Sequence, residues 1–180
     1  MITPQIVMDS FKAVRGNTIQ IARDIPADQY SFRATPETRS VLEYFRDIIR
    51  VTEFVVGVAL SSETVRFTER SRDEWARIFV QTDVAALNTP NEVAAALQSS
   101  IQDLYKRVTE ADDGFLNETF LAPDNIHKVR LWMINTAKEQ EMVLRGQLLL
   151  IERMLGIVPH TTRRQQEAQR AKEQRSAKES

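Results

Sequence analysis

Apolar residues recur at steps of three and four positions through four long stretches of the sequence, and this spacing constrains the fold more than any other feature. It places the apolar side chains on one face of an α-helix. The stretches are approximately residues 4–25, 40–60, 90–109 and 126–155. Thr18 and Thr52 fall within two of these apolar faces. Four such helices, with no stretch that indicates a β-strand, predict an all-α four-helix bundle.

Local signals indicate where the predicted helices begin and end. Thr3-Pro4 and Thr89-Pro90 each combine a capping hydroxyl with a proline at the first helical position. Pro26 is expected to end the first helix, because proline interrupts the helical hydrogen bonds. Gly156 follows the last helix, where glycine is the usual stop residue.

The four predicted helices all lie within residues 1–158, which we expect to form one domain. Within it, residues 61–90 are less regular and contain a short predicted helix at residues 72–80. Residues 159–180 form a charged C-terminal tail, in which arginine and lysine outnumber glutamate. This composition predicts a solvated, fraying helix or a flexible tail. A basic arm for an acidic partner or RNA is the alternative.

Composition excludes several functions. The formal net charge of the chain is −1, which argues against nucleic acid as a partner. The chain has no cysteine, which excludes disulfides, thiolate metal ligands and cysteine nucleophiles and fits a reducing cytoplasm. No apolar run reaches signal-peptide length or the ~20 residues of a membrane span. We therefore expect a cytoplasmic protein without a membrane partner.

Two regions carry a resemblance to a known family. Residues 30–41, YSFRATPETRSV, resemble the loop and helix start that the DinB-like (DinB/YfiT) superfamily places before a ligand-bearing helix. Residues 140–148, QEMVLRGQL, resemble that family's H-E-x-x-H-R-G-Q-L helix, and residues 153–157, RMLGI, resemble its Leu-Gly ending. The resemblance extends from residue 1 to about residue 158. It implies an up-down-down-up bundle with one long crossover, a homodimer formed through helix faces, and a role in a stress response.

The resemblance also implies the position of a metal site. Members of the family bind nickel or zinc through three histidines, one on the second helix and two on the fourth helix, four residues apart. The matching positions here are Asp47, Gln140 and Leu144, and none is histidine. Leucine has no donor atom, and a neutral amide is a weak ligand for either metal. We therefore predict a vestigial site without a metal cofactor.

The vestigial site has two interpretations. In the first, Asp47 and Gln140 face each other and Leu144 fills the volume of the missing imidazole, so that the site is a repaired core. In the second, the three positions line a small polar pocket that still binds an organic ligand.

Other polar residues of the fourth helix are expected to have structural roles. Gln147 falls on its predicted inner face and needs a hydrogen-bonding partner if buried. Arg145 is expected to pair with an acid on a neighbouring helix or subunit. Glu141 is expected to be solvated or to form a salt bridge. Histidine occurs only at His127 and His160, both predicted at the surface.

Two functional hypotheses follow. The first is a metal-free DinB-like protein that binds a small molecule or a protein partner. The second is an enzyme similar to the family's metal-dependent thiol (S-)transferases and isomerases, in which the metal activates the sulfur of a low-molecular-weight thiol. The second hypothesis requires an ion, and the missing histidines weigh against it.

Overall fold

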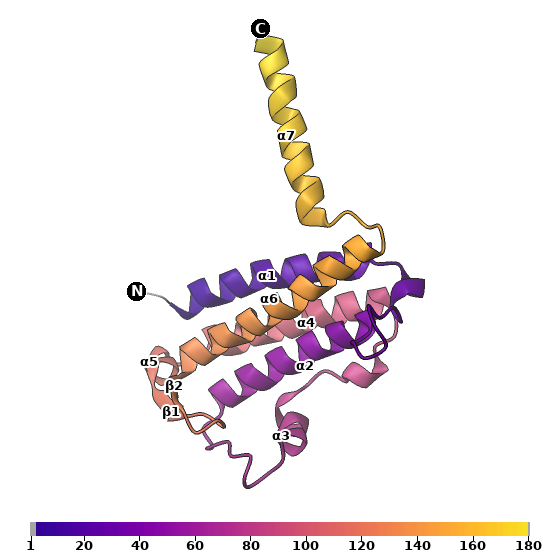
Figure 1. The fold of residues 1–180 in the computed structure, drawn as a ribbon. Helices are drawn as coiled ribbons and strands as arrows, with labels where there is room; N and C mark the ends of the chain where they lie inside the picture. Colours follow the sequence, from indigo (N-terminus) through magenta and orange to yellow (C-terminus); the bar gives the residue numbers. More distant parts are fainter. Residues whose placement is uncertain (1–2, 180) are drawn as a thin grey trace.

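The computed structural model describes residues 3–179 of the chain, with side chains described as far as Arg175. Four long helices form a bundle (Figure 1), as predicted. They are α1 (Pro4–Asp24), α2 (Val41–Leu60), α4 (Pro90–Thr109) and α6 (Arg130–Met154). The connections contain η1 (Ala27–Gln29), α3 (Arg72–Phe79), η2 (Val84–Ala86), α5 (Asp113–Asn117), β1 (Thr119–Leu121) and β2 (His127–Val129).

The long helices run in two opposite directions. Helices α1 and α6 run one way, and α2 and α4 run the other way (Figure 1). Helix α1 packs against α4 and α6, and α2 packs against the same two helices, so α1 and α2 occupy opposite corners. The chain passes from α2 to the parallel helix α4 through one long crossover, residues 61–89, which contains α3. The expected up-down-down-up topology is therefore present.

The predicted capping signals start the helices. Thr89 Oγ1 accepts a hydrogen bond from the Glu92 amide (3.3 Å), and a Glu92 carboxylate oxygen accepts one from the Thr89 amide (2.9 Å). Ser40 and Glu43 form the same reciprocal arrangement at the start of α2. At the end of α6, Gly156 adopts a left-handed φ of 76°, as a helix-ending glycine does.

The start of the fourth helix was predicted wrongly. Residues 126–129 were expected in its first turn, but residues 127–129 form β2, which pairs antiparallel with β1. Asn125 adopts a left-handed φ of 61°, and the Ala122 amide donates to the Ile126 carbonyl (3.0 Å), closing a tight turn. Pro123-Asp124-Asn125 therefore forms a hairpin turn. These residue types suit turns as well as helix starts.

The charged tail contains a further helix, α7 (His160–Glu179), which projects away from the bundle (Figure 1). Its base is joined to α1 by an ion pair between Arg163 and Asp24 (2.6 Å). The structure does not describe the side chains of residues 176–180. Two of the charged residues predicted for the tail, Lys178 and Glu179, are among them. Within residues 3–179, no helix combines the length and the apolarity needed to cross a membrane.

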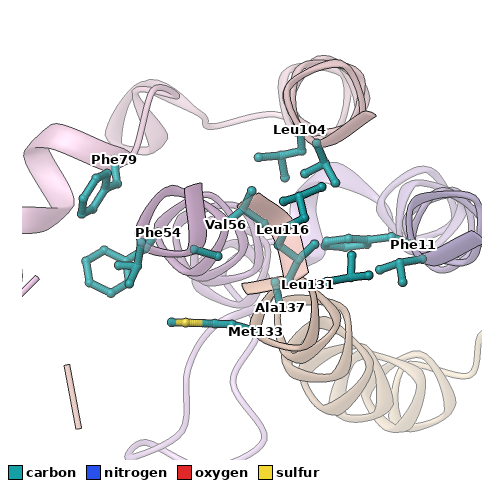
Figure 2. Packing of buried hydrophobic residues seen from close by; sticks show 14 of the residues in the cluster. Phe11, Phe54, Val56, Phe79, Leu104, Leu116, Leu131, Met133 and Ala137 are labelled. Atoms are coloured by element: carbon teal, nitrogen blue, oxygen red, sulfur yellow. The ribbon is translucent and has the colours of Figure 1, made fainter. Parts of the chain in front are cut away.

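The core consists of two apolar clusters at different heights along the bundle. In the hairpin-side core, side chains from all four long helices point toward one another (Figure 2). Its members include Val7, Phe11, Val56, Leu104, Leu131, Ile134 and Ala137. The α7-side core includes Ile21, Phe45, Ile48, Leu97, Leu148 and Ile151.

Helix α6 buries a different face from the one predicted. Gln140 and Gln147, expected on the inner face, are exposed, whereas Glu141 is completely buried. The buried face is therefore offset by one residue, or about 100° around the helix. Periodicity of apolar residues could not reveal this, because α6 also carries apolar residues on its outer face.

Candidate functional site

A buried polar layer lies between the two cores, at mid-height in the bundle. Arg15 is its centre and is inaccessible to solvent. Arg15 Nε donates to both carboxylate oxygens of Glu141, at 3.0 and 2.9 Å. Arg15 Nη2 donates to Thr52 Oγ1 (2.9 Å), and Nη1 donates to the Leu97 carbonyl (3.1 Å). Thr18 Oγ1 donates to Glu141 Oε1 (2.6 Å).

The polar layer connects all four long helices through one guanidinium group. Each nitrogen of the Arg15 guanidinium group has an acceptor, and both oxygens of Glu141 have donors, so the two buried charges are compensated. Glu141 occupies the glutamate position of the H-E-x-x-H-like motif. Its carboxylate is held by Arg15 and Thr18 in the core, where neither side chain of the Arg15–Glu141 pair is accessible to solvent. Of the two expected roles, Glu141 has the salt-bridging one.

Asp47 lies on α2 at the surface end of a cleft. Its side chain is 18% exposed, and its Oδ2 is 2.5 Å from Arg39 Nε. Its Oδ1 is 3.3 Å from Arg50 Nη2. These three side chains line two adjoining cavities, of about 270 Å³ and about 730 Å³. We call the two cavities together the Asp47 cleft.

The Asp47 cleft is built from α2, α3 and the loop before α2. The smaller cavity is also lined by Val51, Phe54, Arg72, Asp73 and Ala76. The larger cavity extends along the loop that precedes α2 and is also lined by Arg33, Glu37, Thr38, Glu43 and Tyr44. No lining residue of either cavity belongs to α6. The other two positions of the predicted vestigial site therefore do not line this cleft.

Those two positions lie on α6 with different surroundings. Gln140 is exposed, and Leu144 is half-buried against the α7-side core. Within residues 3–179, no hydrogen bond joins Gln140 to Asp47, whose carboxylate is held by arginines. Arg145 donates to the Val14 carbonyl at 3.5 Å and forms no ion pair in the described part of the chain. Within the described chain, a backbone carbonyl therefore takes the place of the acid expected on a neighbouring helix, and pairing with an acid of another subunit stays a prediction.

The residues at the family's metal positions do not fit nickel or zinc. Leu144 offers no donor atom, Gln140 offers only an amide, and Asp47 is already paired with two arginines. Catalytic zinc sites use three protein donors, drawn from histidine, carboxylate or thiolate. Among residues 3–179, no group of three or more histidine, aspartate or glutamate side chains is placed to hold a metal ion.

A second group of titratable residues lies where α6 meets α7. Glu152 is completely buried, and neither of its carboxylate oxygens has a hydrogen-bond partner among the described residues. Burial, with the nearby negative charge of Asp24, raises the pKa of Glu152 to about 7. His160 is buried rather than at the surface as predicted, and its Nε2 lies 3.1 Å from Asn17 Oδ1. Burial, followed by the charge of Arg164, lowers the pKa of His160.

Sequence reasoning missed the centre of the polar layer. Arg15 has no motif around it, and its position between apolar residues of α1 is the one available signal. Thr18 and Thr52 were placed on inner faces, and both are buried there. A polar residue on an apolar face needs a buried partner. Here that partner is supplied by helices distant in the sequence.

Comparisons with known proteins agree with this architecture. The sequence model of the DinB superfamily matches residues 10–142. No curated protein sequence matches the chain. Among solved structures, a DinB-like protein of Bacillus subtilis, YjoA, has a similar fold, with a TM-score of 0.62 and 14% sequence identity over 83% of this chain and 92% of that chain. At that identity the likeness concerns the fold alone. Since the family match covers most of the four-helix bundle, the chain belongs to the DinB superfamily.

Proposed function

We propose that this protein is a cytoplasmic, metal-independent binding protein that holds a small organic anion in the Asp47 cleft. The observation that carries the proposal is the convergence of Arg39, Arg50 and Arg72 on one cavity, which contains only two aspartates to balance them. Guanidinium groups bind carboxylates and phosphates through paired N–H donors. The cysteine-free composition suits the reducing compartment in which we place the protein.

The geometry of the arginines supports an anionic ligand. Arg39 contacts Asp47 through Nε, and in the described part of the chain neither Nη of Arg39 has a protein acceptor. Arg50 contacts the same carboxylate through Nη2, at a longer 3.3 Å. A ligand carboxylate or phosphate can therefore accept hydrogen bonds from both arginines without breaking their contacts with Asp47.

The apolar wall of the cavity supports an organic rather than an inorganic ligand. Phe54 and Val51 form this wall, and the guanidinium carbon of Arg72 lies 5.7 Å from the centre of the Phe54 ring. The volume of about 270 Å³ is close to the lower end of the range of small-molecule sites, roughly 300–1,000 Å³. A small carboxylate with a flat apolar body matches this combination.

Thermal shift and calorimetry test the proposal with benzoate, citrate, inorganic phosphate and pyrophosphate as probes. We expect benzoate to raise the Tm of the wild type, and the Arg50→Ala and Arg72→Ala variants to lose that shift. Arg107→Ala is the matched control, because Arg107 forms an exposed ion pair on α4, distant in sequence from the cleft. If none of the probes binds, or if both cleft variants bind like the wild type, the proposal is wrong.

The alternative function is a metal-dependent thiol transferase or isomerase, as in other members of the superfamily. It would need an ion at positions that here offer a single carboxylate. Elemental analysis of protein purified without an affinity tag distinguishes the two functions. One equivalent of nickel or zinc per chain, lost in Asp47→Ala, would favour the enzyme and overturn the metal-independent proposal.

A further inference from the structure

Helix α6 begins beside the hairpin of β1 and β2 (Figure 1). A cavity of about 840 Å³ opens there, and we call it the Trp132 cavity. It is lined by α1, α5, the hairpin turn, β2 and the first two turns of α6. Its described lining residues are all different from those of the Asp47 cleft, so a ligand of that cleft does not occupy it.

The lining of the Trp132 cavity is largely apolar. Val7 and Leu131 are its buried part and belong to the hairpin-side core. Ile126, Val129 and Trp132 also line it, and their side chains are 57%, 37% and 63% exposed. Aromatic rings stack in an offset arrangement, so the exposed indole of Trp132 favours an aromatic ligand. The volume lies in the upper part of the range of small-molecule sites, roughly 300–1,000 Å³, and therefore suits more than one ring.

The charges at this cavity do not favour an ionic ligand. Lys128 is the single lysine, arginine, aspartate or glutamate among the described residues that line it. Its Nζ lies 2.5 Å from Asp124 Oδ2, so a carboxylate of the chain already compensates its charge. An ion would lose hydration on entering and find no uncompensated opposite charge. The Trp132 cavity thus suits an uncharged molecule, in contrast to the arginine-lined Asp47 cleft.

The amide side chains of the lining leave acceptor oxygens free. Asn135 Nδ2 donates to Glu139 Oε1 (2.7 Å), and Asn117 Nδ2 donates to the Asp113 carbonyl (2.8 Å). A carboxylate and a carbonyl can only accept, so each amide must turn its nitrogen toward them. In the described part of the chain, neither Oδ1 receives a hydrogen bond.

Thr136 adds a second acceptor next to that of Asn135. Its Oγ1 donates its own hydrogen to the Trp132 carbonyl (3.3 Å), which leaves lone pairs for a ligand. Trp132, Asn135 and Thr136 stand three and four positions apart, so they share one face of α6. The Asn135 and Thr136 acceptors therefore lie one helical turn from the exposed indole.

From this arrangement we infer that the Trp132 cavity binds an uncharged aromatic molecule bearing a hydroxyl or similar hydrogen-bond donor. The rings stack on Trp132 and pack against Ile126 and Val129. The donor group reaches Asn135 Oδ1 or Thr136 Oγ1. This site is separate from the anion site proposed in the Asp47 cleft and takes a ligand of different chemistry.

Three biphenyl probes of matched size test the chemistry of the ligand. p-Phenylphenol carries a donor, p-phenylanisole lacks it, and p-phenylbenzoate carries a charge. The chain has two tryptophans, of which Trp75 is buried, so Trp75→Phe leaves Trp132 as the single reporter. We expect p-phenylphenol to protect Trp132 from acrylamide quenching and to bind roughly 2- to 10-fold more tightly than p-phenylanisole, as one hydrogen bond allows. Calorimetry on the wild type gives the same affinities without the substitution at Trp75.

Variants test the position of the donor. The double variant Asn135→Leu, Thr136→Val has side chains of similar size without the two acceptors. It should bind p-phenylphenol and p-phenylanisole equally, with unchanged helical circular dichroism. Gln147→Leu is the matched control, because Gln147 is an exposed amide of the same helix that does not line the cavity, and it should keep the wild-type preference.

Several results would overturn the inference. One is that p-phenylphenol leaves Trp132 unprotected, and another is that p-phenylanisole or p-phenylbenzoate binds as tightly. A preference for p-phenylphenol that survives in the double variant does so too. So does a Trp132 that is already shielded from acrylamide in the protein alone, as it would be if a second copy covered the cavity. Trp132 reports on this cavity, so none of these outcomes depends on whether the Asp47 cleft binds an anion.

Discussion

Arg15 and Glu141 form an ion pair at the centre of the bundle, with Arg15 Nε 2.9 Å from Glu141 Oε2 and neither side chain accessible to solvent. The pair joins α1 to α6 across 126 positions of the sequence. Through its further bonds to Thr52 and to the Leu97 carbonyl, Arg15 also holds α2 and α4. A single side chain thus links all four long helices.

Removing one partner of this pair should destabilise the protein strongly. Arg15→Leu or Glu141→Leu leaves an uncompensated buried charge, and we expect a loss of about 3–5 kcal/mol in the free energy of unfolding. The double variant Arg15→Leu, Glu141→Leu should lose less than the sum of the single variants, because neither charge remains. Urea unfolding followed by circular dichroism measures all three. Simple additivity would show that the pair is not coupled.

Glu152 should make stability depend on pH. Its pKa is about 7 in the folded protein and 4.5 at its ordinary value, so the folded state binds the proton more tightly. The stabilisation from the neutral carboxyl is complete below pH 4.5 and is lost as pH rises toward 7. Glu152→Gln should remove this pH dependence and raise the free energy of unfolding above pH 7 by up to about 3 kcal/mol.

The urea unfolding midpoints of wild type and Glu152→Gln should be compared from pH 4.5 to about pH 7. The difference between them isolates the contribution of Glu152. His160 titrates nearby, but its lowered pKa gives the opposite sign: that contribution is lost as pH falls. Glu139→Gln, an exposed carboxyl on the same helix, is the control. A wild-type profile parallel to that of Glu152→Gln would contradict the assignment.

Glu53 should anchor the long crossover to α2. Its Oε2 accepts hydrogen bonds from the amides of Gln81 (2.8 Å) and Thr82 (3.0 Å), and its Oε1 accepts one from Thr82 Oγ1 (2.7 Å). Glu53→Ala leaves these donors without an acceptor and should reduce the free energy of unfolding by about 2–4 kcal/mol. Hydrogen exchange of the Gln81 and Thr82 amides should accelerate. Glu53→Gln retains one acceptor oxygen and should show a smaller effect; equal effects would indicate lost packing instead.

Gly57 should be required for the contact between α2 and α3. A Cβ at this position would lie 2.6 Å from Cβ of Phe79, closer than real contacts allow. We expect Gly57→Ala to destabilise by about 1–3 kcal/mol through overpacking, and Phe79→Ala to relieve part of that strain in the double variant. Gly16→Ala is the control, because a Cβ added at Gly16 would have no neighbour within 4 Å. There the better helix propensity of alanine should stabilise by up to about 1 kcal/mol.

Much of the fold was predictable because it depends on interactions between neighbouring residues. The cap at Thr89 and the stop at Gly156 depend on groups within a few positions of one another, and both were predicted correctly. The hairpin at Asn125 was missed, because a Pro-Asp-Asn segment suits a turn as well as a helix start. The antiparallel pairing of β1 with β2 shows that the segment forms the turn.

The orientation of α6 depended on contacts that no local pattern encodes. Its sequence carries two apolar stripes, so spacing alone could not identify the inner one. The buried guanidinium group of Arg15, 126 positions away in the sequence, stabilises Glu141 on the inner face and thereby turns Gln140 and Gln147 outward. Helices and their ends follow from the order of residues along the chain, whereas the compensation of a buried charge requires helices that only the folded bundle brings together.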